Sequence, residues 1–361
     1  MQIDFHHAVT YVVARLAGLA DADARTVAHA AQYVDDATTD GPLTFVTGER
    51  YVRVTSAHKT LDWLNTDRAD NRLVWVPFHF LPGNAAPPPG SPPADAFLRR
   101  MMCQPDSDIA RAMVLDCVRR RELPYALHRL GVALHTYVDT WAHQQFVGVV
   151  CDLNRIRRID IEPDPAYAAS PVFRQLTSGT ARVEEFLAGH VPVGHAGVLT
   201  LPDLPFLKWS FVRRNGEAVH RDNPADFLRA AEGAYNMARR YAAADEGLGD
   251  EPLPAADRAA IDCLLRQTLF VDGEDRHRAW LDAIRAGAFS FGPADVTYVD
   301  QGAGSWKMVA LGADPDDEEG IAFEFSDAFL ASDWKRFHDA VQHQRLFILH
   351  DLLPRAGLCA S

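Results

Sequence analysis

A predicted helix between residues 124 and 146 constrains the fold and chemistry of this chain more than any other segment. Its sequence, PYALHRLGVALHTYVDTWAHQQF, carries His128, His135, Asp139 and His143. At about 100° per residue, these four side chains fall within roughly 80° of one another. Large apolar residues adjoin them on one side and can anchor the helix in a core, whereas polar residues adjoin them on the other. The His/Asp stripe is therefore predicted to lie where core and solvent meet.

The composition of this stripe is typical of a metal site. Imidazole and carboxylate groups suit zinc, and a spacing of four residues brings two of them to one ion from consecutive turns. Gly131 and Ala142 flank the stripe and leave room for another group to approach the backbone. A face of hydrogen-bonded histidines is the alternative, but three imidazoles converging on one carboxylate favour the metal site. We expect His128, two turns before His135, to be a cleft or second-shell residue, and the same role is expected for His79 and Asp203 outside this helix.

Composition narrows the class of protein. The 361 residues are 48% hydrophobic and 24% charged, which suits one large, well-packed globule. A net charge of −13 without a basic run gives no footprint for duplex nucleic acid. Five scattered cysteines without a CxxC motif predict a reducing compartment and no cysteine ligands. The start MQIDFHHAVTYVVARLAG lacks the pattern of a secretion signal, and no apolar run is long enough to span a membrane, so we expect a cytoplasmic location.

Capping residues and apolar periodicity predict a mainly α protein, a multi-helix bundle in a single domain over residues 1–361. Helices are expected over residues 8–17, 24–37, 108–121, 124–146, 224–244, 255–270, 274–286 and 332–353. Residues 82–93 read as a Pro/Gly-rich loop, and residues 152–207 as irregular backbone around short helical pieces. Residues 289–326 carry aromatic and β-branched runs around an acidic turn. We expect two to four short strands there, a small late β element after the helical core.

Metal-type side chains also occur outside the central helix. They are His6, His7, Asp35, Asp36, His58, His79, His195 and Asp203. Each is a weak candidate alone, because a lone buried histidine is more often a hydrogen-bonded core residue. Together with the stripe they supply enough ligands for a site with more than one metal ion, since two or three zinc ions need about eight or nine nitrogen and oxygen ligands. His338, His343 and His350 do not share one stripe, and we expect them to be structural or surface residues.

Three blocks of the sequence resemble a known superfamily. LGVALHTYVDTWAHQQF is similar to the LG-x-x-LHT-x-x-D-x-x-x-H helix of the HET-C-like branch of the zinc-dependent phospholipase C and single-strand-specific nuclease superfamily. FHHAVTYVVARLAG, followed by AQYVDDAT, resembles the opening of that group, and GHAGVLTLPDLPFLKW resembles its later Gly-His…Pro-Asp segment. The resemblance covers residues 5–210 and suggests an uncharacterised bacterial family within this branch.

This resemblance implies an all-α fold with two or three zinc ions in a cleft. The ligands it implies are His6 or His7, Asp36 or Asp35, His58, His135, Asp139, His143 and His195, with Asp139 bridging two ions. The chain departs from the family in two places. Secreted members bind zinc through their mature N-terminal residue, whereas this sequence starts Met-Gln-Ile. The usual H-x3-E pair is also missing, because His195 is followed by Asp203 at a longer spacing.

The expected function is a zinc-dependent phosphoesterase similar to phospholipase C. Zinc would lower the pKa of a bound water, and Asp36 or Asp35 would orient that water for attack on phosphorus. The partner would be a phosphoester substrate such as a phospholipid headgroup, and other divalent metals would also suit the ligands. One alternative is a catalytically silent structural or effector protein that keeps the metals. Another is a single-strand nuclease, which the acidic charge disfavours.

Overall fold

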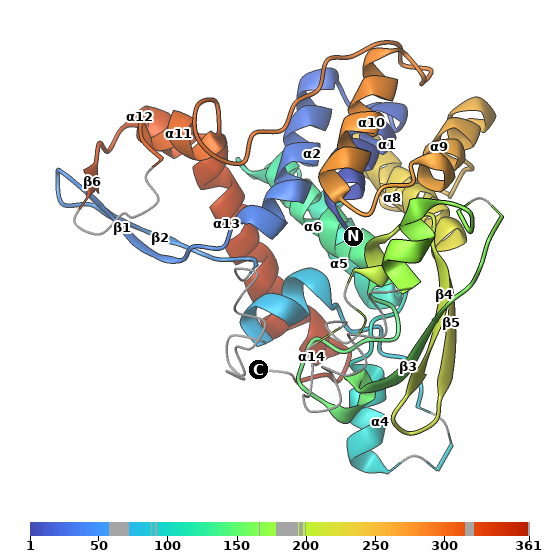
Figure 1. Ribbon diagram of the computed structural model, residues 1–361. Coiled ribbons are helices and arrows are strands. Elements are labelled where there is room, and N and C mark those ends of the chain that lie inside the picture. Colours follow the sequence, from blue (N-terminus) through green and yellow to red (C-terminus); the bar gives the residue numbers. More distant parts are fainter. Residues whose placement is uncertain are drawn as a thin grey trace.

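The computed structural model describes residues 1–57, 72–87, 89–90, 92–165, 167–177, 194, 198, 200–314 and 321–359. It is mainly helical, with two small three-stranded sheets on opposite sides of the helical body (Figure 1). This agrees with the mainly α fold predicted from the sequence. Among the described helices, none is both long and apolar enough to cross a membrane.

Helix α6 (Ala126–Ala142) runs through the middle of the helical body. It packs against α2 (Asp21–Asp36), α5 (Asp108–Arg119), α8 (Asn223–Ala243) and α13 (Asp333–Phe347) (Figure 1). All of its residues but one are buried. The His/Asp stripe of this helix therefore lies inside the protein, deeper than the boundary position expected from the sequence.

The other helical elements cover and cap this core. They are η1 (Asp4–Val9), α1 (Thr10–Leu16), η3 (Trp75–His79), α4 (Pro93–Arg100), η4 (Asp152–Asn154), η6 (Leu201–Asp203), α9 (Ala255–Gln267), α10 (Gly273–Arg285), α11 (Trp306–Leu311), α12 (Asp327–Ala331), η7 (Ile348–Leu352) and α14 (Leu353–Arg355). Of these, η1, η3 and η7 are π-helical, and η4 and η6 are turns of 3-10 helix. The predicted helices are confirmed to within a few residues at their ends.

Gly131 brings α2 and α6 unusually close together. A Cβ atom at this position would lie 2.4 Å from the carbonyl oxygen of Val27 and 2.7 Å from the Cβ of Ala30. Both atoms belong to α2, so a larger residue would force the two helices apart. The close crossing places the last turn of α2 opposite the middle of α6, where the His/Asp stripe lies.

The β structure differs from the prediction. One sheet has the order β2-β1-β6 and the other the order β3-β4-β5. Their strands are β1 (Gly41–Phe45), β2 (Arg50–Arg53), β3 (Ile156–Ile161), β4 (Lys208–Arg213), β5 (Ala218–Asp222) and β6 (Ala322–Phe323). All neighbours are antiparallel except β1 and β6.

The two to four strands expected over residues 289–326 are not found in the described part of that stretch, so this prediction was wrong. The described part of that stretch contributes only the two-residue strand β6, which pairs with β1 near the start of the chain. Ser305 instead caps the short helix α11, because its hydroxyl accepts a hydrogen bond from the backbone N–H of Met308. Most strand residues lie in segments where no strand was expected.

Candidate metal centre

Three residues of α6 form the base of the site. His135, Asp139 and His143 follow one another at intervals of four and are 0%, 1% and 5% exposed. Nε2 of His135 lies 3.4 Å from Oδ2 of Asp139, and Nδ1 of His143 lies 3.6 Å from the same oxygen. The helical spacing thus brings both imidazoles to one carboxylate, as the sequence predicted.

His79 meets this base from η3. Its Nδ1 lies 3.3 Å from Oδ2 of Asp139 and 3.3 Å from Nε2 of His135. The sequence offered His79 only as a cleft or second-shell candidate. The structure brings it among the other ligand-type groups because the π-helical turn Trp75–His79 points it inward. Its place in the apolar run VPFHF was the one signal that it would be buried.

Backbone carbonyls fix which ring nitrogen of His135 and which ring nitrogen of His79 faces Asp139. His135 Nδ1 donates to the carbonyl of Ala31 at 2.7 Å, and His79 Nε2 donates to that of Ser56 at 2.9 Å. A carbonyl can only accept, so the other nitrogen of each ring carries the lone pair when the ring is neutral. Outer hydrogen bonds of this kind orient metal-binding histidines in proteins.

When both rings are neutral, two nitrogen lone pairs therefore face each other between His79 and His135. At 3.3 Å, Nδ1 of His79 and Nε2 of His135 repel each other unless a proton or metal cation lies near both. Two ligand atoms bound at 2.0–2.1 Å to one tetrahedral ion are about 3.3 Å apart. The spacing of these two nitrogens, and of each from Asp139, therefore fits a shared metal ion.

The start of the chain closes the site from another side. His6 is fully buried in η1, and its Nε2 lies 3.3 Å from Oδ1 of Asp139. Neither ring nitrogen of His6 has a hydrogen-bond partner among the described residues, and its ring stacks on His135 at 3.8 Å. A buried imidazole with no hydrogen bond is costly unless it has a ligand. Arg276 of α10 holds η1 in place, because its Nε donates to Oδ2 of Asp4 at 2.7 Å.

The amino group of Met1 also reaches the site, which the sequence did not predict. Its nitrogen lies 2.5 Å from Oδ1 of Asp139 and 3.2 Å from Oδ1 of Asp203. Burial alone would lower the pKa of this ammonium group, but Asp139 and Asp203 raise it to about 11. Asp203 also lies 3.6 Å from Nε2 of His143, so η6 contributes a second carboxylate.

Asp35 and Asp36 end α2 but face different surroundings. Oδ1 of Asp35 lies 3.7 Å from Nε2 of His135 and 3.8 Å from Nδ1 of His79. Asp36 turns away and accepts hydrogen bonds from Tyr298 and Gln32. Burial raises the pKa of Asp36 to about 6, although these two hydrogen bonds oppose the shift. Asp35 is thus the member of the pair that adjoins the centre, and its side chain is 32% exposed.

We call these residues the Asp139 cluster. Its members are Met1, His6, Asp35, His79, His135, Asp139, His143 and Asp203. Within it, His6, His135 and Asp139 form one triad whose ligand atoms lie within 4.8 Å of one another, and Asp35, His79 and His135 form a second. The buried His/Asp groups could therefore bind one or two metal ions.

Asp139 is placed to join the two triads. Its Oδ1 faces His6 and its Oδ2 faces His79 and His135. Burial alone would raise the pKa of this carboxyl, but His143 and the Met1 ammonium lower it well below its usual value. Asp139 therefore stays ionised inside the protein, which a bridging ligand must do.

Other candidates lie elsewhere. Nδ1 of His7 lies 2.9 Å from Nε2 of His277, and Nε2 of His128 lies 3.0 Å from Asp333. Neither histidine joins the Asp139 cluster. His58 and His195 lie outside the described residues.

The C-terminal histidines occupy three different surroundings. His338 is buried and its Nδ1 donates to the carbonyl of Val54 at 3.1 Å. Nδ1 of His343 lies 3.1 Å from the hydroxyl of Tyr125, and His350 is exposed. These contacts agree with the structural and surface roles expected for them.

A family of unknown function, DUF6765, matches residues 1–352 of the chain. The chain belongs to this family. No curated protein and no solved structure matches it. Function must therefore be inferred from the Asp139 cluster itself.

Proposed function

We propose that the Asp139 cluster binds zinc and that the protein is a metal-dependent phosphoesterase. The observation that carries this proposal is the pair of nitrogens of His79 and His135, which face each other at 3.3 Å while backbone carbonyls hold the opposite nitrogens. Apart from the Met1 ammonium group, the cluster consists of imidazoles and carboxylates, a set that suits zinc. Cys103, the buried thiol near Asp139, points its Sγ at the carbonyl of Leu81 instead.

The roles of the residues follow from their exposure. The histidines and Asp139 are almost fully buried and would hold the ions, with Asp139 shared between them. Asp35 is the cluster carboxylate with the most exposed side chain, and it would orient a water and accept its proton at a carboxylate oxygen. The chemistry supplied by zinc in such a site is the activation of water as a nucleophile and the stabilisation of charge on the phosphoryl oxygens.

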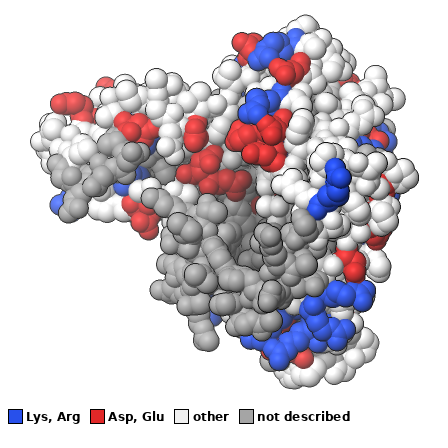
Figure 2. Space-filling view, in the orientation of Figure 1, with Lys and Arg blue, Asp and Glu red and all other residues white. Residues whose placement is uncertain are grey.

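The resemblance to the zinc-dependent phospholipase C and nuclease superfamily supports the phosphoester as substrate. The HTYVDTWAH block supplies three members of the cluster, and the FHH and VDD blocks supply His6 and Asp35. The superfamily assignment is part of this proposal, as is the preference for zinc. Figure 2 shows acidic side chains gathered near the middle of one face, which disfavours a nucleic-acid backbone as substrate.

The test combines metal analysis with hydrolysis assays. Purified protein should contain one to three zinc ions per chain by mass spectrometry. It should also hydrolyse a phosphodiester such as bis(p-nitrophenyl) phosphate or a phospholipid in vesicles. Chelation should abolish turnover and zinc should restore it, while Asp35→Asn should lower kcat at least a hundredfold with metal retained. Metal without turnover on any phosphoester would instead indicate the silent structural or effector protein.

A further inference from the structure

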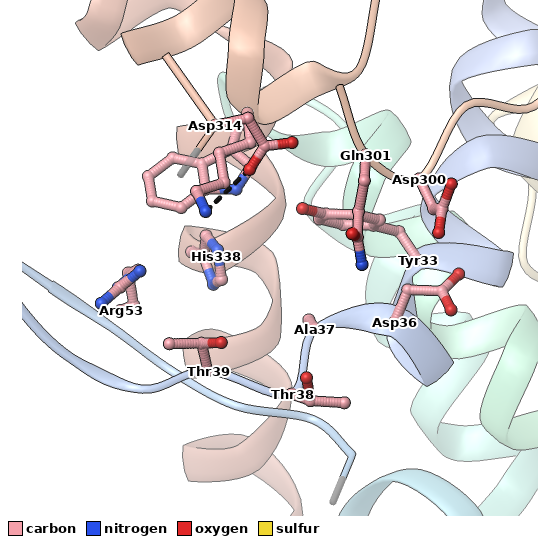
Figure 3. A pocket seen from close by; sticks show the side chains of 12 residues that line it. Tyr33, Asp36, Ala37, Thr38, Thr39, Arg53, Asp300, Gln301, Asp314 and His338 are labelled. Atoms are coloured by element: carbon pink, nitrogen blue, oxygen red, sulfur yellow. Dashed lines mark ion pairs between the residues drawn. The ribbon is translucent and has the colours of Figure 1, made fainter. Parts of the chain in front are cut away.

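A cavity that is separate from the Asp139 cluster lies at the end of α2. It has a volume of about 200 Å³ and is lined by α2, the segment 37–39, β2, the segment 300–301, α11 and α13 (Figure 3). It contains Asp36 but no described member of the Asp139 cluster.

One end of this cavity is acidic and aromatic. The carboxylates of Asp36 and Asp300 lie near each other beside the ring of Tyr33 (Figure 3). Tyr298 and Gln32 both donate to Oδ2 of Asp36, and within the described residues no hydrogen bond reaches its Oδ1. This end therefore offers carboxylate oxygens and an aromatic face, which together attract an organic ammonium group.

The other end presents a buried hydrogen-bond acceptor. His338 is 3% exposed, and its Nδ1 donates to the carbonyl of Val54. Burial, with Arg53 and Lys307 nearby, lowers the pKa of His338 to about 3, so the ring is neutral near pH 7. Nε2 then carries a lone pair, and among the described residues it has no hydrogen-bond partner. A group that donates a hydrogen bond would satisfy it.

The cations of the cavity are engaged by the protein. Nζ of Lys307 lies 2.8 Å from Oδ1 of Asp314, and Arg53 donates to the carbonyl oxygens of Asp40 and Gly41. The segment 38–39 adds the hydroxyl groups of two threonines. The groups that remain for a ligand are thus mainly acceptors.

These acceptors do not form a metal site. Among the described residues, groups of three His, Cys, Asp or Glu side chains with metal-ligand spacing occur only in the Asp139 cluster. Asp36 and Asp300 are a pair without a third such ligand. An ammonium group needs only two or three acceptors around it and tolerates the aromatic wall that a metal ion would not use.

We propose that this cavity binds a small amino alcohol. Its ammonium group would lie between Asp36 and Asp300 against Tyr33, and its hydroxyl would donate to Nε2 of His338. Asp300 is exposed and Asp36 is partly so, which gives the charged end access from solvent.

Titration calorimetry on the whole protein with its metal retained tests this proposal. The probes are ethanolamine, aminopropanol and aminobutanol, each compared with the diol and the alkylamine of equal length. The best amino alcohol should bind at least tenfold more tightly than its diol and several-fold more tightly than its alkylamine. A diol that binds as tightly as the amino alcohol would overturn the cation site. An alkylamine that binds as tightly as the amino alcohol would overturn the role of His338.

Two matched variants locate the binding. Asp300→Asn removes an exposed carboxylate of the cavity and should weaken the amino alcohol about fivefold. Glu122→Gln removes an exposed carboxylate elsewhere and should leave the affinity unchanged. If Asp300→Asn has no effect, the amine binds at another place, such as the Asp139 cluster, and the proposal fails. If the wild-type protein binds the amino alcohol but hydrolyses no phosphoester, only the proposed phosphoesterase activity is rejected.

Discussion

Two buried groups of histidines lie on either side of η1, and only one has the character of a metal site. In the Asp139 cluster, ionised carboxylates stand between the imidazoles. In the second group, which we call the Tyr298 cluster, the rings pack against one another and against two large aromatic side chains. Its members are His7, His29, His128, His277, Tyr298 and Trp306. Asp333 contacts His128 of the Tyr298 cluster, whereas Asp139 lies within 3.6 Å of four histidines. A carboxylate shared among several imidazoles, and not the number of histidines, therefore separates a ligand set from a core.

The electrostatics of the two clusters differ accordingly. Burial lowers the pKa of all four histidines in the Tyr298 cluster, to about 3 for His29 and about 4 for His277. In the Asp139 cluster burial also lowers the pKa of His135, but contact with Asp139 and Asp35 raises that of His79. The carboxylates of the Asp139 cluster attract cations, whereas the lowered pKa values in the Tyr298 cluster disfavour positive charge on its own rings.

The largest expected effect is the loss of metal on substitution of Asp139. Asp139→Asn should remove most of the bound metal, because an amide cannot neutralise two cations. His343→Asn, outside both clusters, should retain it. Mass spectrometry of the two purified variants measures the difference. Equal metal content would show that Asp139 is not a ligand, and loss in the His343 variant would mean that a C-terminal histidine binds metal.

Metal removal should lower thermal stability. Bound ions would tie together residues from η1, α2, η3 and α6, so a chelator should lower Tm by roughly 5–10 °C. Differential scanning calorimetry before and after chelation, with zinc restored as a control, measures this shift. An apo protein that melts at the holo temperature would indicate a cleft formed by packing alone.

The adjacent residues His6 and His7 give a matched test of the two clusters. His6→Asn should weaken metal binding tenfold or more, whereas His7→Asn should keep the metal. His7→Asn should instead reduce the free energy of unfolding by about 1–3 kcal/mol, because His277 loses its buried partner. Metal titrations and urea unfolding separate the outcomes. Similar metal affinities in both variants would erase the distinction between the clusters.

The smallest expected effect is a pH dependence in the Tyr298 cluster. The folded-state pKa of His29 is about 3 and its unfolded value about 6.5, so folding disfavours its protonation. The stability it contributes is complete above pH 6.5 and is lost as the pH falls, at up to about 1.4 kcal/mol per pH unit. The free energy of unfolding of His29→Gln should therefore fall less steeply than that of the wild type between pH 6.5 and 4.5. His220→Gln changes an exposed residue of β5 and should show the same pH dependence of stability as the wild type. A His29→Gln variant with the wild-type pH dependence would contradict the prediction.

The sequence predicted the base of the site because it lies on one regular helix. The spacing of His135, Asp139 and His143 fixes their shared face wherever the helix packs. The choice between His6 and His7 could not be made, because η1 is π-helical and turns its side chains through a different angle per residue. The choice between Asp35 and Asp36 depends on the rotation of α2 about its axis, which Gly131 sets through its contact with Val27 and Ala30.

The β structure was less predictable, because it depends on pairing partners far along the chain. The strand β3 alternates poorly, with Ile159 as its one buried residue, and becomes a strand because β4 lies beside it. Residues 289–300 contain strand-like apolar residues, yet Phe289 and Val296 are buried in the helical core and no strand forms. Tertiary packing decided both cases against local propensity.

The ion pair between Asp4 and Arg276 has a consequence for how the protein is made. η1, which carries His6, packs on α10, so this ligand is held in place by residues that are synthesised some 270 positions later. On the ribosome, η1 emerges about 270 residues before Arg276, which supports it in the folded protein. Any metal that the Asp139 cluster binds would therefore be loaded late in biogenesis, and a chain whose translation stops before α10 would leave the ribosome without the support of His6.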